Sequence, residues 1–499
     1  MFSKVLIANR GEIACRIART LRVIGVRSVA VCSEADRGAL HTRVADEVRL
    51  IGPAEPRASY LNQEAVIAAA QASGAQAIHP GYGFLAENAA FAAEVEAAGL
   101  VFIGPTSDQV RAMGDKRAAR AIATRAGVPV VPGVEGRDGA ALASEARRLG
   151  FPVMVKAALG GGGKGMRVVE EPAALEEALE SAMRLAQSAF GDGAVYLEKR
   201  LERARHVEVQ IVGDGRGRAV HLFERECSLQ RRHQKVIEES PSPVVDEALR
   251  ARLTAAAVAL AEAVAYRGLG TVEFLLAPDR AFYFLEMNTR LQVEHPVTEM
   301  VTGLDLVRVQ LEIAADGRLP FEQDQVSARG HAIEARVYAE DAARNFLPQS
   351  GKVIKVRWAS EPHVRVDAGI EAGDTVPVHY DPIVAKLVVT GESRPQAVER
   401  LAAALDESVV HGVTTNLPFL RALARAGAVQ QAQVDTEWIE REFLAGFAAL
   451  AEAPAPELAL AAAALGELLG VPGVSPHVAR ARRPSVYAAL GRWRHPGLG

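Results

Sequence analysis

The stretch LEMNTRLQVEH, residues 285–295, alternates polar and apolar side chains, and this period constrains the local fold more than any other feature of the chain. Side chains of a β-strand point to opposite faces in turn, so the pattern predicts an extended segment with its polar groups on one face, about 6.6 Å apart. That face is either a solvated surface or a row of ligands and catalysts, and the alternation alone leaves both open. Its polar members are Glu286, Asn288, Arg290, Gln292 and Glu294.

An apolar run precedes this stretch in TVEFLLAPDRAFYFLEMN, and the two together predict a β-hairpin. Glu273 lies inside the apolar run, where an unpaired carboxylate is costly to bury. If APDR is a four-residue turn, Glu273 pairs with Phe284 and shares a face with Glu286. Asn288 is one step further along that face, and three oxygen donors suit Mg²⁺ that also binds phosphates. A three-residue turn would reverse the register, and the alternative is a strand with ordinary surface carboxylates.

The glycine-rich stretch LGGGGKGMRVV, residues 159–169, also indicates chemistry. Its backbone N–H groups are free of side-chain obstruction and Lys164 adds charge, so the loop is suited to close over phosphates. It is not the G-x-x-x-x-G-K-[ST] phosphate loop, because no Ser or Thr follows Lys164. A flexible hairpin connection is the alternative. Lys156 lies on the apolar strand that enters the loop, and a buried ammonium there requires an anionic partner.

Two further polar clusters are less specific. IEARVYAED places Glu334, Arg336, Tyr338 and Glu340 at alternate positions, which is more typical of a half-solvated strand with ion pairs. RECSLQRRHQK is basic but lacks interleaved aromatic residues, so an anion-binding wall is favoured over a nucleic-acid patch. Single residues of a reactive type, Cys227, His79 and His206, are interpreted as buried structural residues.

The predicted elements divide the chain into units. KVLIA, SVAVC, AQAIHPG and LVFIGP alternate with Ala-rich helices, a βαβ series that predicts an open parallel sheet, and the first turn lacks the G-x-G-x-x-G dinucleotide fingerprint. A strand, the glycine loop, a helix and another strand follow. From His206 the pattern is mostly β, interrupted by one long helix at 246–265. The expected fold is α/β and α+β multidomain, with units at 1–115, 116–203, 204–330 and 331–446 and an Ala/Pro-rich linker at 447–499.

Composition and charge exclude several classes of protein. The 499 residues are 49% hydrophobic and 24% charged, which is ordinary for a soluble globular protein. The net charge of −4 gives no reason to expect nucleic acid or an anionic membrane as a partner. Neither a signal peptide nor a membrane span is predicted. The few, widely spaced cysteines argue against disulfides, so a cytoplasmic protein is expected; they are Cys15, Cys32 and Cys227.

These stretches together resemble the biotin carboxylase component of biotin-dependent carboxylases, in the ATP-grasp superfamily. EMNTRLQVEHPVTE combined with QRRHQK is the most specific part of the likeness. The resemblance implies an N-terminal Rossmann-like domain with an open parallel sheet, an ATP-grasp lid and central domain, and a C-terminal biotin carboxylase domain. The matching stretches run in family order over about residues 1–445: IANRGEIACRI, IHPGYGFLAEN, FIGP, MGDK, KAALGGGGKGMRVV, ERECSLQRRHQKVIEE, FLEMNTRLQVEHPVTEM, GHAIEARVYAED and NFLPQSGKV.

The resemblance also implies a reaction and its residues. ATP and bicarbonate would give carboxyphosphate, and the carboxyl group would pass to N1′ of biotin. Glu294 would be the base that deprotonates bicarbonate, and Arg336 would stabilise the biotin enolate. The implied metal ligands for Mg²⁺ or Mn²⁺ are Glu273, Glu286 and Asn288. The residues implied to hold bicarbonate are Lys235, Arg290, Gln292, Val293 and Glu294, and Lys235, Arg290, Glu294 and Arg336 would be catalytic. Those implied to hold ATP are Lys116, Lys156, Gly162, Gly163, Glu198, Lys199, Arg200, Leu201, His206 and His233, with Glu273 and Glu286.

Two features depart from a stand-alone subunit of this family. HYDPIVAKL and the tail PSVYAALGRWR are more similar to longer acyl-CoA carboxylase α chains. No A-M-K-M biotinyl-lysine motif is present, so biotin is expected on a separate carrier protein or on a domain absent from this chain. A carboxyltransferase subunit and a homodimer or larger complex are the other expected partners, with no nucleic acid and no membrane.

Two alternatives are weighed against this interpretation. Another ATP-grasp ligase, of the carbamoyl phosphate or purine-precursor type, would keep the metal strand but lose VEHPVTE and EARVYAED, and both are present. A catalytically silent scaffold subunit would show lost charges at positions such as Lys235 or Glu294, and none is lost.

Overall fold

The N-terminal unit is an open sheet of parallel strands. The structure is a computed structural model that describes residues 1–157, 167–190 and 193–451. The strand order is β3-β2-β1-β4-β5, and neighbouring strands run parallel, which confirms the predicted βαβ arrangement. The elements are β1 Lys4–Ile7, α1 Gly11–Val23, β2 Arg27–Ser33, α2 Leu40–Val44, β3 Glu47–Gly52, α3 Gln63–Ser73, β4 Ala77–His79, α4 Ala89–Ala97, β5 Val101–Phe102 and α5 Ser107–Gly114.

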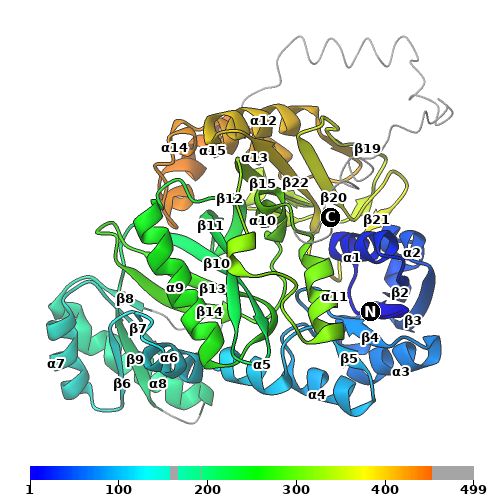
Figure 1. The fold of residues 1–499 in the computed structure, drawn as a ribbon. Coiled ribbons are helices and arrows are strands. Elements are labelled where there is room, and N and C mark those ends of the chain that lie inside the picture. Colours follow the sequence, from blue (N-terminus) through cyan, green and yellow to red (C-terminus); the bar gives the residue numbers. More distant parts are fainter. Residues whose placement is uncertain (158–166, 191–192, 452–499) are drawn as a thin grey trace.

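A smaller unit follows and stands out from one side of the molecule, at the lower left of Figure 1. Its antiparallel sheet has the order β6-β9-β7-β8, and α7 and α8 cover it with a small apolar core of their own. The glycine-rich loop connects β7 to β8 and lies outside the described residues, as do Gly162 and Gly163. The elements are α6 Lys116–Arg125, β6 Gly133–Gly136, α7 Gly139–Leu149, β7 Val153–Ala157, β8 Arg167–Val169, α8 Leu175–Phe190 and β9 Val195–Lys199.

An antiparallel sheet in the order β14-β13-β10-β11-β12-β15-β22-β20 forms the centre of the molecule. It runs through both units predicted for 204–446, because β12 pairs with β15. Its strands are β10 Arg205–Asp214, β11 Ala219–Arg231, β12 Gln234–Ser240, β13 Arg267–Leu276, β14 Phe282–Asn288, β15 His331–Tyr338, β20 Val364–Ala368 and β22 Ile383–Gly391. The domain boundaries themselves stay a prediction.

Helices flank this sheet and short strands complete the C-terminal part, at the top of Figure 1. The helices are α9 Glu247–Ala263, α10 His295–Thr302, α11 Leu306–Asp316, α12 Arg394–Glu407, α13 Leu417–Arg425, α14 Gly427–Gln430 and α15 Leu444–Ala451. The short strands are β16 Glu340–Asp341, β17 Leu347–Pro348, β18 Gly351–Lys352, β19 Lys355–Arg357, β21 Thr375–Val376 and β23 Val409–His411. Among the described residues, no helix is both long and apolar enough to cross a membrane.

The β13–β14 hairpin corrects the predicted turn but keeps the predicted face. Leu276 pairs with Phe282, one residue later than a four-residue turn would place it. That shift alone would move Glu286 to the opposite face from Glu273. A second shift follows at Leu285, which is the extra residue of a β-bulge, and it brings Glu273 directly opposite Glu286. The two carboxylates therefore share a face as predicted, but as a direct pair and not a diagonal one.

The predicted extension of this strand to residue 295 is wrong. β14 ends at Asn288, and residues 289–294 form an irregular segment and a turn that leads into α10. Pro296 lies in the first turn of α10, where its fixed φ and missing N–H suit a helix start. Arg290, Gln292 and Glu294 are therefore presented by a loop and not by the strand face that carries Glu286.

Two other interpretations are tested by burial. β15 is buried along its whole length, between β12 and β22, so the half-solvated strand expected for IEARVYAED is wrong. Cys227 is fully buried and burial raises the pKa of its thiol well above the usual value, which confirms a structural thiol. His79 is also fully buried, beside the amide of Gln310 at 3.2 Å, and burial lowers its pKa to about 3.

Candidate active site

The ammonium of Lys235, on β12, lies among buried carboxylates from three separate elements. Its Nζ is 2.6 Å from Glu208 on β10, 2.8 Å from Glu273 on β13 and 2.6 Å from Glu294 in the turn before α10. Burial disfavours the charged ammonium, yet the carboxylates outweigh it and hold the pKa of Lys235 well above its usual value. One cation thus holds together groups that are far apart in the sequence.

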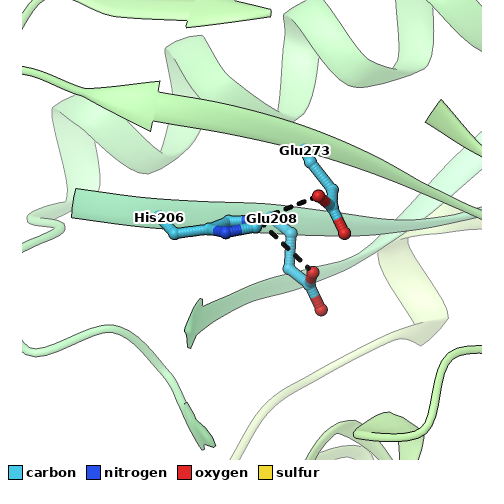
Figure 2. Close-up of side chains that lie close together, drawn as sticks. All are labelled: His206, Glu208 and Glu273. Atoms are coloured by element: carbon cyan, nitrogen blue, oxygen red, sulfur yellow. Dashed lines mark ion pairs between the residues drawn. The ribbon is translucent and has the colours of Figure 1, made fainter. Parts of the chain in front are cut away.

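Glu273 is the most heavily bonded of these carboxylates. Its Oε1 also accepts hydrogen bonds from Asn288 Nδ2 at 2.9 Å and Gln292 Nε2 at 3.0 Å. His206 Nε2 lies 3.0 Å from the other oxygen, and Figure 2 shows His206, Glu208 and Glu273 pointing toward one another. Burial would raise the pKa of Glu273, but Lys235 and His206 hold it well below the usual value.

The group in Figure 2 has the spacing of a metal site, since one ligand atom from each residue lies within 4.8 Å of the others. The ammonium of Lys235 already bonds to both of its carboxylates, Glu208 and Glu273. A second cation at this place would repel that ammonium at close range. We therefore assign no metal to this group, in which both carboxylates are bonded to Lys235; in the predicted pair of Glu273 and Glu286, only Glu273 is bonded to that ammonium among the described residues.

Glu294 is fully buried between two cations. Lys235 Nζ is bonded to its Oε1, and Arg336 of β15 donates to its Oε2 at 2.9 Å. Burial favours the neutral acid, but Lys235, Arg336 and Arg225 together hold the pKa of Glu294 well below its usual range. The carboxylate is therefore ionised at any neutral or alkaline pH.

Arg290 is fixed by a residue that the sequence reasoning missed. Its Nε donates at 2.8 Å to Glu87, which lies just before α4 in the N-terminal unit. Its other nitrogens donate to Asn288 Oδ1 at 3.0 Å and to Gln292 Oε1 at 3.2 Å. Glu87 belongs to the matching stretch IHPGYGFLAEN, but no period or neighbouring pattern distinguishes it from an ordinary loop carboxylate.

Glu208 was also missed, although it is a charged residue in the apolar strand HVEVQIVG, the same signal that identified Glu273. Arg225 was expected only as part of the basic cluster RECSLQRRHQK. Arg225 is fully buried, and it donates to Glu208 at 2.5 Å and to Gln210 at 2.7 Å. Of the basic cluster RECSLQRRHQK, the structure therefore brings Lys235 into the site, whereas Arg225 lies behind it and fixes Glu208.

The residues predicted to bind nucleotide lie around the smaller unit and the edge of the central sheet. Lys156 Nζ is 2.8 Å from Glu198, which confirms the anionic partner expected for this lysine. The ammonium of Lys199 is bonded instead to the carbonyl oxygens of Gly150 and Phe151, each at 2.9 Å.

Three more of the predicted nucleotide residues lie outside the cluster around Lys235. The Arg200 guanidinium pairs with Glu170 and Glu437. Leu201 is half-buried just after β9, and His233 is exposed in the turn between β11 and β12. None of these side chains contacts Lys235 in the described part of the structure.

The predicted metal ligands have a donor set and electrostatics that fit a divalent ion. Glu286 is half-buried, and its pKa is raised by burial and by the charge of Glu273 across the strand pair. Lys116 Nζ, 3.9 Å away, opposes that shift. A cation between the two carboxylates would remove their repulsion, and carboxylate and amide oxygens are the ligands that Mg²⁺ and Mn²⁺ prefer. Asn288 would add its amide oxygen, which accepts a hydrogen bond from Arg290 in this structure.

Three family models match the chain in order. They are "Biotin carboxylase, N-terminal domain" at residues 1–110, "Carbamoyl-phosphate synthase L chain, ATP binding domain" at 115–322 and "Biotin carboxylase C-terminal domain" at 334–441. Biotin carboxylase 2 of Bacillus subtilis is 49% identical over 443 residues, which cover 88% of this chain and 100% of that protein. The chain belongs to the biotin carboxylase family. Membership confirms the predicted family and fold class. It supports an ATP-dependent ligase that carboxylates biotin, and it does not favour another ATP-grasp ligase or a silent scaffold subunit.

Longer members of the biotin carboxylase family are similar as well. The mitochondrial methylcrotonoyl-CoA carboxylase subunit alpha of Dictyostelium discoideum is 50% identical over 472 residues, 94% of this chain and 67% of that protein. The same subunit of Oryza sativa subsp. japonica is 52% identical over 88% of this chain and 60% of its own length. The chain therefore spans about three-fifths to two-thirds of these α subunits.

Solved structures of the family have the same fold. The crystal structure of a biotin carboxylase–β,γ-ATP complex from Campylobacter jejuni matches with a TM-score of 0.83 and 43% identity, over 89% of this chain and 99% of that chain. The biotin carboxylase domain of a thermophilic 2-oxoglutarate carboxylase bound to bicarbonate matches with a TM-score of 0.84 and 39% identity, over 88% and 98%. Family membership implies that ATP and a divalent metal ion are used.

Proposed function

We propose that this chain uses ATP and bicarbonate to carboxylate biotin carried on a carrier protein or domain, as the first half-reaction of a biotin-dependent acyl-CoA carboxylase. The observation that carries the proposal is the buried, ionised carboxylate of Glu294, held between the cations Lys235 and Arg336. Deprotonation of a small anion such as bicarbonate requires a base with cations beside it, since cations offset the repulsion between two anions.

Glu294 is proposed as that base. In the structure both of its oxygens are bonded to cations, which makes it a weak base. An anion that draws Lys235 toward itself removes part of this positive field, so the basicity of Glu294 rises when bicarbonate arrives. Proton acceptance is thereby tied to the presence of the substrate.

Arg290, Gln292 and the backbone at Val293 are proposed to hold bicarbonate beside Glu294. All three lie in the irregular segment between β14 and α10 that also carries the base. The guanidinium of Arg290 presents a planar set of donors that suits a planar oxyanion. Lys386, which is fully buried, donates to the carbonyl oxygen of Val293 at 3.0 Å and fixes this segment from behind.

ATP is proposed to bind between the smaller unit and the central sheet. The residues proposed for it are Lys116, Lys156, Gly162, Gly163, Glu198, Lys199, Arg200, Leu201, His206 and His233. Glu273, Glu286 and Asn288 are proposed to hold Mg²⁺ or Mn²⁺, whose chemistry is to neutralise phosphate oxygens and align them for transfer. Phosphoryl transfer depends on such positioning and charge stabilisation, which the nearby Lys116 also provides.

Arg336 is proposed to face biotin, since its guanidinium is suited to stabilise the negative charge of an enolate. A biotin carrier protein or domain and a carboxyltransferase subunit are the proposed partners, supported by the α subunits that the chain matches. A homodimer or larger complex and a cytoplasmic location also belong to the proposal. The bacterial relative supports that location, whereas the α subunits named above are mitochondrial.

The proposed activity is tested by ATP hydrolysis with purified protein. Release of phosphate should depend on bicarbonate and on Mg²⁺ or Mn²⁺, and free biotin should accelerate it. A folded sample that hydrolyses ATP with no response to bicarbonate would indicate a different ATP-grasp reaction. A folded sample with no hydrolysis under any of these conditions would indicate a silent subunit.

A further inference from the structure

Two carboxylates beside the site have no role in the reaction above. Glu238 of β12 and Glu334 of β15 lie directly opposite each other in the antiparallel pair, and both are completely buried. Side chains at directly opposite positions have Cβ atoms about 4.5–5.5 Å apart, close enough for like charges to repel strongly. Two ionised carboxylates at such a place are costly unless cations compensate for both.

The cations available do not compensate for both carboxylates. Arg336 Nε donates to Glu238 Oε1 at 2.5 Å, and Arg336 Nη2 lies at the same time on Glu294. Neither oxygen of Glu334 has a hydrogen-bond partner among the described residues, and neither does Oε2 of Glu238. The ammonium of Lys386 is bonded elsewhere, to the carbonyl of Val293 at 3.0 Å and to Glu12 at 3.3 Å.

The charged and titratable groups that face this pair come from each neighbouring element. They are Arg336 on β15, Lys235 on β12, Cys227 on β11, Lys386 on β22 and Glu294 before α10. Burial raises the pKa of Glu238 to about 7, with Arg336 opposing the shift and Glu294 adding to it. Burial also raises the pKa of Glu334 well above its usual value, and Lys386 only partly offsets this.

We propose that Glu238 and Glu334 together hold one proton, which is on Glu334, and that Glu238, as the ionised member, is the positioning residue that holds Arg336 against Glu294 for the carboxylation of biotin. The inference rests on the proposed function, because it concerns the residue proposed to face biotin. Glu334, with no partner, keeps the proton. Glu238 keeps the charge, because it alone of the two is bonded to a guanidinium.

The consequence is a pH dependence confined to one part of the reaction. When Glu238 is protonated as well as Glu334, Arg336 loses one of its two ionic partners and its orientation is less restricted. Glu294 still has Lys235, so bicarbonate-dependent ATP hydrolysis without biotin should respond much less. The ratio of biotin-stimulated to biotin-independent hydrolysis should therefore rise with pH as Glu238 ionises, around pH 7.

The test compares this ratio in the wild type and in Glu238→Gln, between about pH 6 and about pH 9. The glutamine keeps an acceptor for Arg336 but does not ionise. We expect a ratio that no longer rises with pH and is lower by about tenfold at alkaline pH, the scale of one hydrogen bond to a charged group. The KM for ATP should be unchanged. If the ratio in Glu238→Gln rises with pH as it does in the wild type, the proposal is overturned. A loss of ATP affinity in this variant would overturn it as well.

Two further variants complete the design. Glu239→Gln removes the next carboxylate on β12, which is bonded to His331 and Arg394 outside the site, and should keep the wild-type rise. Loss of the rise in this control would show that any buried charge on β12 has the same effect and would overturn the proposal. If Glu238→Gln does not fold, Glu238→Asp is measured instead. In this variant the ratio of biotin-stimulated to biotin-independent hydrolysis should still rise with pH but stay below the wild-type ratio, and a ratio equal to that of the wild type would overturn the proposal. A wild type that biotin does not stimulate contradicts the proposed function itself.

Discussion

Removal of the Lys235 ammonium should destabilise the protein in a pH-dependent way. Lys235→Met leaves Glu208, Glu273 and Glu294 without their shared cation, at a position where the lysine side chain is only 11% exposed. Breaking a buried ion pair from one side costs about 3–5 kcal/mol of unfolding free energy. The loss of unfolding free energy should lie toward the lower end of this range, because each carboxylate keeps another partner. The remaining partners are Arg225 for Glu208, His206 for Glu273 and Arg336 for Glu294.

The sign of the pH dependence follows from the carboxylates. The pKa values of Glu273 and Glu294 are lowered in the folded protein, so each stabilises it above the pKa of the unfolded chain, near 4.5. Without Lys235 that stabilisation decreases. The folded-state pKa values lie well below 4.5, so the two carboxylates of the folded protein are still ionised at pH 4.5, and their contribution is lost only as the pH falls through the folded-state pKa values. The difference between wild type and variant should therefore be about 3 kcal/mol between about pH 5 and about pH 8 and decrease only in more acidic solution.

Urea denaturation at several pH values, followed by circular dichroism, measures this difference. Lys4→Met is the matched control, because Lys4 pairs with the single carboxylate of Glu47 in the N-terminal sheet. The control should lose about 1 kcal/mol or less. A Lys235→Met variant as stable as the control at every pH would refute the conclusion that Lys235 holds these carboxylates together.

Three other variants separate the proposed roles. Glu294→Gln should retain ATP binding, measured by calorimetry, but lose bicarbonate-dependent turnover at least a hundredfold, the usual scale of a general base; retained turnover would exclude it as the base. Arg336→Ala should slow biotin carboxylation more than biotin-independent ATP hydrolysis, and an equal loss in both would argue against its role toward biotin. Glu286→Gln should raise the Mg²⁺ concentration that gives half-maximal activity about tenfold, the typical effect of a lost charged ligand; an unchanged Mg²⁺ requirement would remove Glu286 from the metal site.

The β13–β14 hairpin shows which features of this site can be predicted from the sequence and which cannot. Alternation and the buried Glu273 predict the shared face with Glu286 correctly, because one buried face fixes which side chains point inward. The turn length is wrong, and the β-bulge at Leu285 restores the face. A bulge inserts one residue without any composition signal in this stretch, so neither the turn nor its compensation could be predicted from the pattern.

Long-range pairing explains the residues that were missed. Glu87 reaches Arg290 only because the N-terminal unit packs beside β14, and Glu238 meets Arg336 only because β12 pairs with β15. Sequence periodicity describes which face a residue occupies on its own strand but not which strand lies beside it. The resemblance to the biotin carboxylase family supplied the roles for Lys235 and Arg336 that periodicity could not.

The transfer of labelled bicarbonate carbon to biotin tests the central claim most directly. Wild-type protein is incubated with ATP, Mg²⁺, free biotin and isotopically labelled bicarbonate, and the biotin is isolated under alkaline conditions and counted. The proposed function predicts label in biotin that depends on ATP and is absent in Glu294→Gln. Hydrolysis of ATP by the wild type with no label in biotin would contradict it.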